Sequence, residues 1–313
     1  MWIVVATAAS AIVTSQSPAT ALASQSPATA LAQAAGGAGV PESYRREIDA
    51  FHRHREDQLT SDGGWLSVAG LFWLKPGANR FGADRSNDVV LPPSAPAHAG
   101  TFWFEAGAVR VEVAPGVPLT LGGRPVTQKT LRSDTGGADP DVLALGPLTL
   151  QIIERGGRLA VRLKDKERAE RKHFKGLVWY PINPAYRIVA RFVPHARPTT
   201  ITVPSIIGTA EAMPSPGSAV FELGGRSVRL DPVVEAGDTR LFFIFRDATA
   251  GKTTYGAGRF LYADPPKDGR VILDFNQAVS PPCAVTPYAT CPLPPQQNHL
   301  PIAIEAGEMS AGH

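Results

Sequence analysis

The spacing of hydrophobic residues changes once along the chain, near residue 64. Between residues 41 and 59, apolar side chains recur every three or four positions, with Arg, Glu and Asp between them. This spacing is typical of an amphipathic helix, and Asp62-Gly63-Gly64 provides a stop. We therefore predict one helix within residues 41–64, with His52 and His54 at its solvated surface. Its apolar face would carry Tyr44, Ile48, Phe51 and Leu59.

Residues 65–165 consist of short runs in which apolar and polar residues alternate. Examples are LSVAGLFWL, TFWFE and VRVEV, and Gly, Pro or Asp separates such runs. Alternation places one side of each strand against a core, and turns at intervals of about ten residues are typical of a β-sandwich. We therefore predict a sandwich over residues 65–165.

A charged run, RLKDKERAERKHFKG, separates this region from a second one at residues 166–313. The run predicts a solvated loop or short helix. Strand-like segments then resume, among them YRIVARFV, TTITVPSI, TRLFFIF and RVILDFN, without a stretch that predicts a crossover helix. The second region should therefore form an antiparallel sheet or barrel.

The chain ends in a proline-rich segment, Gln277–Pro301, which we expect as a long ordered loop packed on that sheet. The 30 Gly and 29 Pro suit many strands joined by tight turns. The fold class is therefore predicted to be all-β, with two β-rich modules and one N-terminal helix.

The N-terminal 40 residues differ in composition from the rest. An apolar run, Trp2–Val13, precedes two copies of SQSPATALA, and each copy ends in the small-x-small pattern of signal peptidase sites. We predict a secretory signal cleaved after Ala23 or Ala32, and hence an exported protein. A low-complexity disordered leader is the alternative.

The net charge gives no indication of nucleic-acid binding, and the hydropathy gives none of a membrane span. Lys and Arg number 31 against 28 Asp and Glu, a net charge of +3 that is too small to indicate nucleic-acid binding. No run of about 20 apolar residues follows the N-terminus, so no transmembrane span is expected in the mature protein.

The first module resembles the forkhead-associated domains, β-sandwiches that read phosphothreonine through loop residues. The resemblance rests on the order of GANRFGADRSNDVVLP, HAGTF, LTLGGRPV and DVLALGPLTLQI over about ninety residues. The Arg that follows the first-loop Gly in those domains is Ala83 here, and Ser94 and His98 only loosely match their Ser-x-x-His. The resemblance therefore implies the fold and gives only weak support to a phosphopeptide site.

A second resemblance covers almost everything after the leader. The run from Thr239 to Gly307 and the segment DGGWLSVAGLFWLKPGANRFG resemble a bacterial family known as domain of unknown function 1684. Val279, Ser280 and Val285 depart from that family's usual loop, which puts any role of these three positions in doubt. The resemblance implies no established activity.

The sequence contains no complete motif for a cofactor or a metal ion. RDATAGKTT has Arg246 where a phosphate-binding loop needs its first Gly, and a strand-like run follows instead of a helix. A hairpin turn carried by Asp247, Thr249 and Gly251 explains it better. The chain has no Gly-x-Ser-x-Gly, His-Glu-x-x-His or Cys-x-x-Cys. We therefore expect no cofactor and no metal.

The two cysteines, Cys283 and Cys291, both lie in the proline-rich segment. A disulfide between them is the simplest expectation for an exported protein. A metal pair completed by His299 and a pair of free thiols are the alternatives.

Eight polar residues cluster in sequence around the proline-rich segment and could converge on one pocket beneath it. They are Arg246, Asp247, Tyr255, Arg259, Asp274, Asn276, His299 and Glu305. Their structural alternative is that Arg246 pairs with Asp247, Arg259 pairs with Asp274 across strands, and Asn276 caps a turn.

Two hypotheses of function follow. The first is a module that binds an unknown small ligand, or acts as a scaffold, with Arg246, Asp247, Tyr255, Arg259 and Asn276 as ligand-binding candidates. The second is a hydrolase that uses Asp274, His299 and Glu305, with Arg246 or Arg259 as anchor for the substrate.

Overall fold

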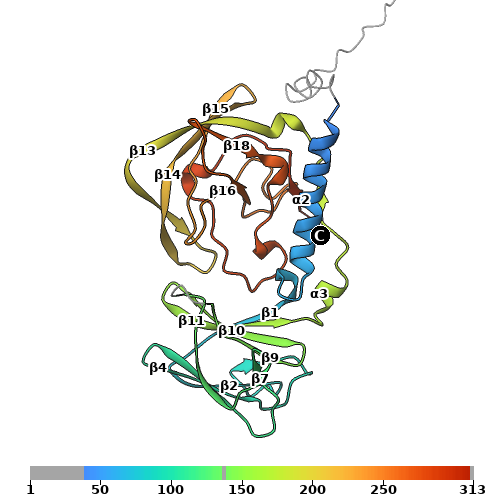
Figure 1. Ribbon diagram of the computed structural model, residues 1–313, viewed down its shortest axis with the longest axis vertical. Helices are drawn as coiled ribbons and strands as arrows, with labels where there is room; N and C mark the ends of the chain where they lie inside the picture. Colours follow the sequence, from blue (N-terminus) through green and yellow to red (C-terminus); the bar gives the residue numbers. More distant parts are fainter. Residues whose placement is uncertain (1–38, 136–138, 311–313) are drawn as a thin grey trace, which may run out of the picture. The chain divides into compact units, whose positions relative to one another are not determined.

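A computed structural model describes residues 39–135 and 139–310 of the chain (Figure 1). The predicted export signal, with cleavage after Ala23 or Ala32, lies outside the described residues. Residues 40–313 form one compact unit. The unit is mostly β with one long N-terminal helix, which confirms the predicted fold class.

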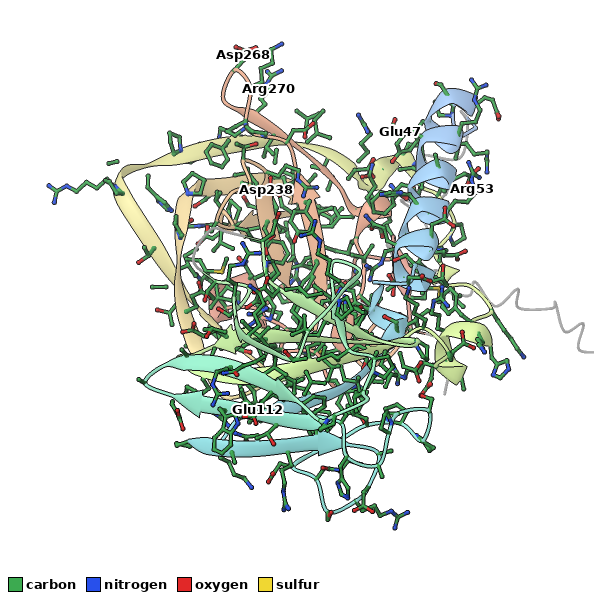
Figure 2. All side chains as sticks on the ribbon, turned by 60° about the horizontal axis from the view of Figure 1, so that its bottom comes forward. Glu47, Arg53, Glu112, Asp238, Asp268 and Arg270 are labelled. Carbon is green, nitrogen blue, oxygen red and sulfur yellow. The ribbon has the colours of Figure 1, made fainter. Side chains whose placement is uncertain are left out.

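Helix α2, Glu42–Thr60, turns Tyr44, Ile48 and Leu59 into the protein and leaves Arg53 on its outer side (Figure 2). Pro41 precedes the helix, where its missing N–H and fixed φ cost nothing. Gly64 allows the chain to turn back against the end of the helix, because a Cβ there would stand 2.3 Å from the Leu59 oxygen. The apolar spacing thus decides which side of the helix is buried.

The first module is a sandwich of two sheets. One sheet has the strand order β3-β2-β4-β5-β8, and the other β1-β11-β10-β9-β6-β7. The first sheet consists of β2 (Gly77–Gly82), β3 (Val89–Val90), β4 (Gly100–Glu105), β5 (Ala108–Val113) and β8 (Gln128–Leu131). The second consists of β1 (Val68–Trp73), β6 (Thr120–Leu121), β7 (Arg124–Pro125), β9 (Val142–Leu145), β10 (Leu148–Arg155) and β11 (Arg158–Asp165).

The core of the sandwich lies between these sheets. Phe81 and Phe102 stack there with ring centroids 4.5 Å apart, and Leu150 and Val161 face them from the second sheet. Alternation along each strand supplies this layer, since successive side chains point to opposite faces. The module is therefore the predicted β-sandwich.

The second module is built on a four-stranded antiparallel sheet with the order β15-β14-β13-β18. Its strands are β13 (Arg187–Pro204), β14 (Ala210–Leu223), β15 (Arg226–Leu230) and β18 (Arg270–Asp274). The expected strands YRIVARFV and TTITVPSI are one strand of 18 residues. The register with β14 shifts between Pro194 and Thr199, so the pairing is irregular at the junction of the two expected strands.

A hairpin of β16 (Leu241–Phe245) and β17 (Arg259–Ala263) is covered on both faces. Leu241, Phe243 and Phe245 face the core of the four-stranded sheet, whereas Phe242 and Ile244 face a smaller core that includes Ile201, Val203 and Cys291. The hairpin confirms that RDATAGKTT is a turn and not a phosphate-binding loop.

Short elements complete the chain. They are α3 (Ala169–Lys172), the paired strands β12 (Val178–Trp179) and β19 (Glu308–Met309), and the single-turn helices η1 (Trp65–Ser67), η2 (Pro184–Tyr186), η3 (Phe275–Gln277), η4 (Pro282–Ala284) and η5 (Gln296–Asn298). Helix α3 lies in the predicted charged connection. Among the described helices, none has the length and apolar character needed to cross a membrane.

Candidate functional site

The proline-rich segment lies along the β16–β17 hairpin and is fixed to it at several points. Val279 bridges Phe260, His299 bridges Arg246, and Pro292 bridges Ser205 at the end of β13. Gly258 permits the close approach, because a Cβ at this position, with φ of +107°, would stand 2.5 Å from the Phe245 oxygen and 2.6 Å from Pro294. The segment is thus an ordered layer over the smaller core.

Asn298 is the main polar anchor of this layer. Its buried amide accepts a hydrogen bond from the Asp231 N–H at 2.9 Å and donates to the oxygens of Asp231 and Ile244 at 2.9 and 3.0 Å. The side chain thereby satisfies backbone groups after β15 and in β16 that a neighbouring strand would otherwise bond.

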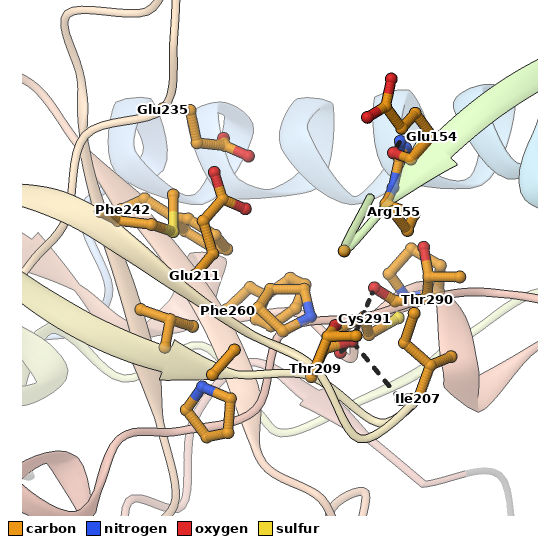
Figure 3. A pocket seen from close by; sticks show the side chains of 18 of the residues that line it. Glu154, Arg155, Ile207, Thr209, Glu211, Glu235, Phe242, Phe260, Thr290 and Cys291 are labelled. Atoms are coloured by element: carbon orange, nitrogen blue, oxygen red, sulfur yellow. Dashed lines mark hydrogen bonds between the residues drawn. The ribbon is translucent and has the colours of Figure 1, made fainter. Parts of the chain in front are cut away.

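A cavity of about 700 Å³ opens beside the segment (Figure 3). Its wall combines the proline-rich segment, the hairpin, the far ends of β13 and β14, and the turn between β10 and β11. Residues that line it include Trp65, Arg155, Val203, Glu211, Met213, Glu235, Phe242, Phe260, Tyr262, Ser280 and Cys291.

Aromatic rings of the hairpin form one side of this cavity. Phe242 and Tyr262 stack with centroids 4.5 Å apart and an interplanar angle of 5°, while Phe260 meets Phe242 edge-on at 4.9 Å. The same register that pairs Phe242 with Tyr262 places both rings on one face of the hairpin. An apolar, ring-bearing molecule would find matching surface here.

The charged groups of the cavity are distributed unevenly. Glu211 and Glu235 lie near Phe242 in the view of Figure 3, whereas Arg155 and Glu154 lie apart from them. Glu235 accepts a hydrogen bond from the Tyr262 hydroxyl at 2.7 Å. Burial, followed by the neighbouring Glu235 carboxylate, raises the pKa of Tyr262 far above its usual range.

Both arginines of the cavity wall already have partners. Arg155 Nη2 pairs with Asp134 at 2.8 Å. Arg55, from helix α2, donates to the Ser280 oxygen at 2.8 Å and lies 3.6 Å from buried Glu308. Burial raises the pKa of Glu308, an effect that Arg55 opposes.

Arg259 and Asp247 form an ion pair that is shut off from solvent. Arg259 is 0% exposed, and its Nη2 lies 3.3 Å from Asp247 Oδ2 and donates to the Ile304 oxygen at 2.8 Å. Nη1 donates to the Ala306 oxygen, and Asp247 accepts the Ile304 N–H at 2.7 Å. The pair therefore holds Ile304 and Ala306 against the hairpin turn.

Asp274 and Asn276 belong to a different cluster, under helix α2. The Tyr44 hydroxyl donates to Asp274 at 2.9 Å, and Asp274 also pairs with Arg187 at 3.2 Å. Asn276 donates to Tyr44 and accepts the Asn183 N–H, both at 2.9 Å. Burial and the Asp274 carboxylate raise the pKa of Tyr44 well above its ordinary value.

These contacts correct four sequence-based expectations. Asp247 pairs with Arg259 and not with Arg246, and Asp274 pairs with Arg187 and not with Arg259. Asn276 joins α2 to the segment before β13 and does not cap the turn into Pro281. Likewise His52 is not a solvated side chain, because it stacks on Trp179 with centroids 3.6 Å apart.

The other candidates are dispersed. Arg246 is exposed and donates to the Gly256 oxygen at 3.1 Å, and exposed His299 makes a 3.3 Å contact with the Pro294 oxygen. Glu305 is exposed near Tyr186. No hydrogen bond or ion pair within residues 39–135 and 139–310 links any two of Asp274, His299 and Glu305. The hydrolase hypothesis therefore gains no support.

None of the eight candidates lines the aromatic cavity, although the cavity borders the proline-rich segment as the pocket hypothesis supposed. Sequence reasoning missed Glu211, Glu235 and the aromatic side of the hairpin. One signal was available: LFFIF has apolar residues on both faces, so a second layer had to cover it. Nothing in the sequence indicated that part of this layer would remain open.

Cys283 and Cys291 are free thiols, so the predicted disulfide is absent from this structure. They are in contact, since the Cys283 N–H donates to Cys291 Sγ at 3.2 Å. Among the described residues, no three His, Cys, Asp or Glu side chains gather in a way that could hold a metal ion.

The fold and the cavity define a class: a two-module β protein in which a sandwich is followed by an antiparallel sheet and a hairpin layered by a proline-rich segment. This chain belongs to the family described as "Protein of unknown function (DUF1684)", whose model matches residues 172–309. A relative by sequence is an uncharacterized protein of Haloarcula marismortui, solved by solution NMR. It shares 34% identity over 46% of this chain and 81% of its own, with a TM-score of 0.39.

Solved forkhead-associated domains are also similar to part of the chain. The FHA-2 domain of an ABC transporter from Mycobacterium tuberculosis has 26% identity over 28% of this chain and 77% of its own, with a TM-score of 0.22. An FHA domain from Chlamydia trachomatis has 21% identity over 29% and 81%, with a TM-score of 0.21. No curated protein matches the sequence.

Proposed function

We propose that this protein binds a small organic molecule in the aromatic cavity, and that the ligand joins an apolar ring to a cationic group. The observation that carries the proposal is the composition of the wall, where stacked rings stand beside two carboxylates. The volume of about 700 Å³ falls in the range of small-molecule sites.

The apolar part of the ligand would lie on Phe242, Phe260 and Tyr262. These rings are held by the core beneath them, so their surface is preformed and binding orders few side chains. Offset stacking on such rings contributes about 0.5–1.5 kcal/mol beyond burial of area.

The charge of the ligand follows from the pairing of the wall residues. Arg155 and Arg55 are engaged by Asp134 and Glu308, whereas Glu211 and Glu235 have no ion pair among the described residues. Arg240, over the Tyr262 ring at 4.6 Å, pairs with Asp238. Among the residues that line the cavity, these carboxylates are thus charges without an ion pair, and a ligand ammonium would satisfy them and the ring faces together.

A thermal-shift screen tests the proposal. The panel contains arylalkyl amines, each with an alcohol and a carboxylate of the same skeleton. We expect only the amines to raise the unfolding temperature, with about 2.7 kcal/mol of stabilisation at a concentration of 100 times the dissociation constant.

Glu211→Gln and Glu235→Gln should each weaken amine binding about tenfold, because each removes one charge-assisted contact. Glu222→Gln is the matched control, since Glu222 is exposed on the same strand as Glu211 and does not line the cavity. Equal stabilisation by alcohols and amines would refute the ionic part. A flat response to the whole panel would favour a scaffold function.

We also infer that the protein is exported, on the evidence of the two Ala-Leu-Ala sites that follow the apolar run in the sequence. Intact mass of the protein from periplasm or medium should correspond to a chain that begins at Ser24 or Gln33. Full-length protein confined to the cytoplasm would contradict export.

A further inference from the structure

The two thiols of the proline-rich segment are held next to each other by contacts of the backbone. Besides the hydrogen bond from the Cys283 N–H to Cys291 Sγ, the Tyr255 hydroxyl donates to the Cys283 oxygen at 3.4 Å. The Cys291 oxygen accepts from the Ile206 N–H at 3.0 Å and from the Ser205 hydroxyl at 3.3 Å. The backbone oxygen of each cysteine thus anchors its segment in addition to the sulfur contact.

The two sulfurs differ in access. Cys283 is half-buried, whereas Cys291 is 4% exposed and forms part of the cavity wall. An outer thiol over an inner thiol is the arrangement in which one sulfur meets a reagent from solvent and the other reacts only with its neighbour.

A buried cation stands behind the inner thiol. Arg162 is 8% exposed, its guanidinium lies over the Trp65 ring at 5.1 Å, and its Nε and Nη2 have no hydrogen-bond partner among the described residues. The hydrogen bond to Cys283 and burial raise the pKa of Cys291 overall, and the positive charge of Arg162 opposes them only in part. A thiolate is therefore expected on Cys283 and not on Cys291.

We propose that Cys283 and Cys291 form a thiol–disulfide exchange site, in which Cys283 attacks a small disulfide molecule and Cys291 resolves the product. The Cys283 thiolate bonds to one sulfur of the small disulfide, whose sulfur–sulfur bond breaks and releases one thiolate. Cys291 then loses its proton and bonds to the Cys283 sulfur, releasing the second thiol. In sum the protein loses two electrons and two protons, and the small disulfide becomes two thiols.

The acidity of the pair agrees with these roles. A hydrogen bond from the Cys291 thiol lowers the pKa of Cys283 to about 7, and the same contact together with burial raises the pKa of Cys291. The titratable groups that face the pair are Arg162 and Tyr255. The proposal does not depend on the amine ligand proposed for the cavity.

To test the proposal, reduced protein is mixed with oxidised glutathione at about pH 7. Its intact mass and the number of thiols that can still be alkylated are then measured over time. Wild type should end two protons lighter, with both thiols protected, and reduced glutathione should reverse this without denaturant. Cys291→Ser should stop at a mixed disulfide on Cys283. Cys283→Ser should react about tenfold more slowly, because Cys291 is buried and less acidic.

The rate for Cys291→Ser should rise with pH and level off above the pKa of Cys283. Circular dichroism of both serine variants checks that each is folded. Equal rates for the two variants would overturn the assigned roles. An oxidised form that glutathione reduces only after unfolding would overturn the exchange site in favour of a structural disulfide. If wild type does not react with oxidised glutathione at all, the exchange site and the roles assigned to the two cysteines are both overturned.

Discussion

At the scale of single residues, pairs of buried polar groups hold separate segments of this protein together. Arg259 and Asp247 satisfy each other and three backbone groups of the final segment. A charge in such a place is tolerated only while its partner remains, because the desolvation of one unpaired ion costs several kcal/mol.

Replacement of Arg259 by Leu should therefore lower the free energy of unfolding by about 3–5 kcal/mol, since it leaves the Asp247 carboxylate buried without its ion-pair partner. Urea denaturation followed by circular dichroism measures the change. Arg246→Ala is the matched control on the same hairpin, and its exposed side chain predicts an effect within about 0.5 kcal/mol. Comparable losses in both variants would show that the pair is not the anchor.

A second prediction concerns His52 and the dependence of the free energy of unfolding on pH. Burial against Trp179 lowers the pKa of His52 below its usual value of 6.5, an effect that outweighs its hydrogen bond to the Asn276 oxygen. The folded state therefore favours the neutral ring. The stability that this contributes is fully present above pH 6.5 and is lost as the pH falls below it.

Urea unfolding at about pH 7.5 and about pH 5.5 checks the sign. Wild type should lose more stability on acidification than His52→Gln, which cannot titrate in this range. His54→Gln, an exposed change two residues away, should retain the wild-type profile. Identical pH profiles for wild type and His52→Gln would be the contrary result.

At the scale of elements, the proline-rich segment owes its order to hydrogen bonds and burial, because it forms no strand of a sheet between Gln277 and Pro301. Asn298 alone supplies three of these bonds between β15, β16 and the segment.

Asn298→Ala should cost about 2–4 kcal/mol, since it leaves a donor and two acceptors buried without partners. Hydrogen exchange should locate the loss at Leu300 and Arg246, whose backbone groups bond next to the site. Gln297→Ala is the control, because Gln297 is exposed in the same turn. A local anchor would be contradicted if exchange became faster across the whole molecule and the Leu300 and Arg246 amides showed no larger increase than the rest.

At the scale of the whole molecule, sequence patterns predicted the elements better than their contacts. The helix, the sandwich, the antiparallel module and the hairpin turn follow from period and turn chemistry, which act over a few residues. The pairing of Arg259 with Asp247 and the length of β13 depend on residues far apart in the chain, and no local pattern encodes them. The cavity escaped prediction for the same reason.

Hydrogen bonds link the second module to the sandwich and to helix α2. The Thr286 hydroxyl donates to the Val68 oxygen of the sandwich at 3.1 Å. Arg171 donates to the Thr60 oxygen of α2 at 2.6 Å, and Arg55 of α2 donates to the Ser280 oxygen at 2.8 Å. Residues 40–313 also cluster as one unit. We therefore expect both modules to unfold together.

Native-state hydrogen exchange should give Ile152 of β10 and Phe243 of β16 the same opening free energy, to within about 0.5 kcal/mol, because both would exchange only through global unfolding. Thr286→Val should lower the two values equally. Separate values that differ by more than about 2 kcal/mol would mean that the modules unfold independently.

The β16–β17 hairpin, enclosed on both of its faces, bears on how this family can vary. On β13, whose outer side chains meet solvent, every second position is free to accept new residues over generations. Across Leu241–Phe245 no such freedom exists, because each side chain touches one core or the other. Saturation mutagenesis should therefore find five consecutive intolerant codons there, and divergence between homologues should accumulate first at outward positions such as those of β13.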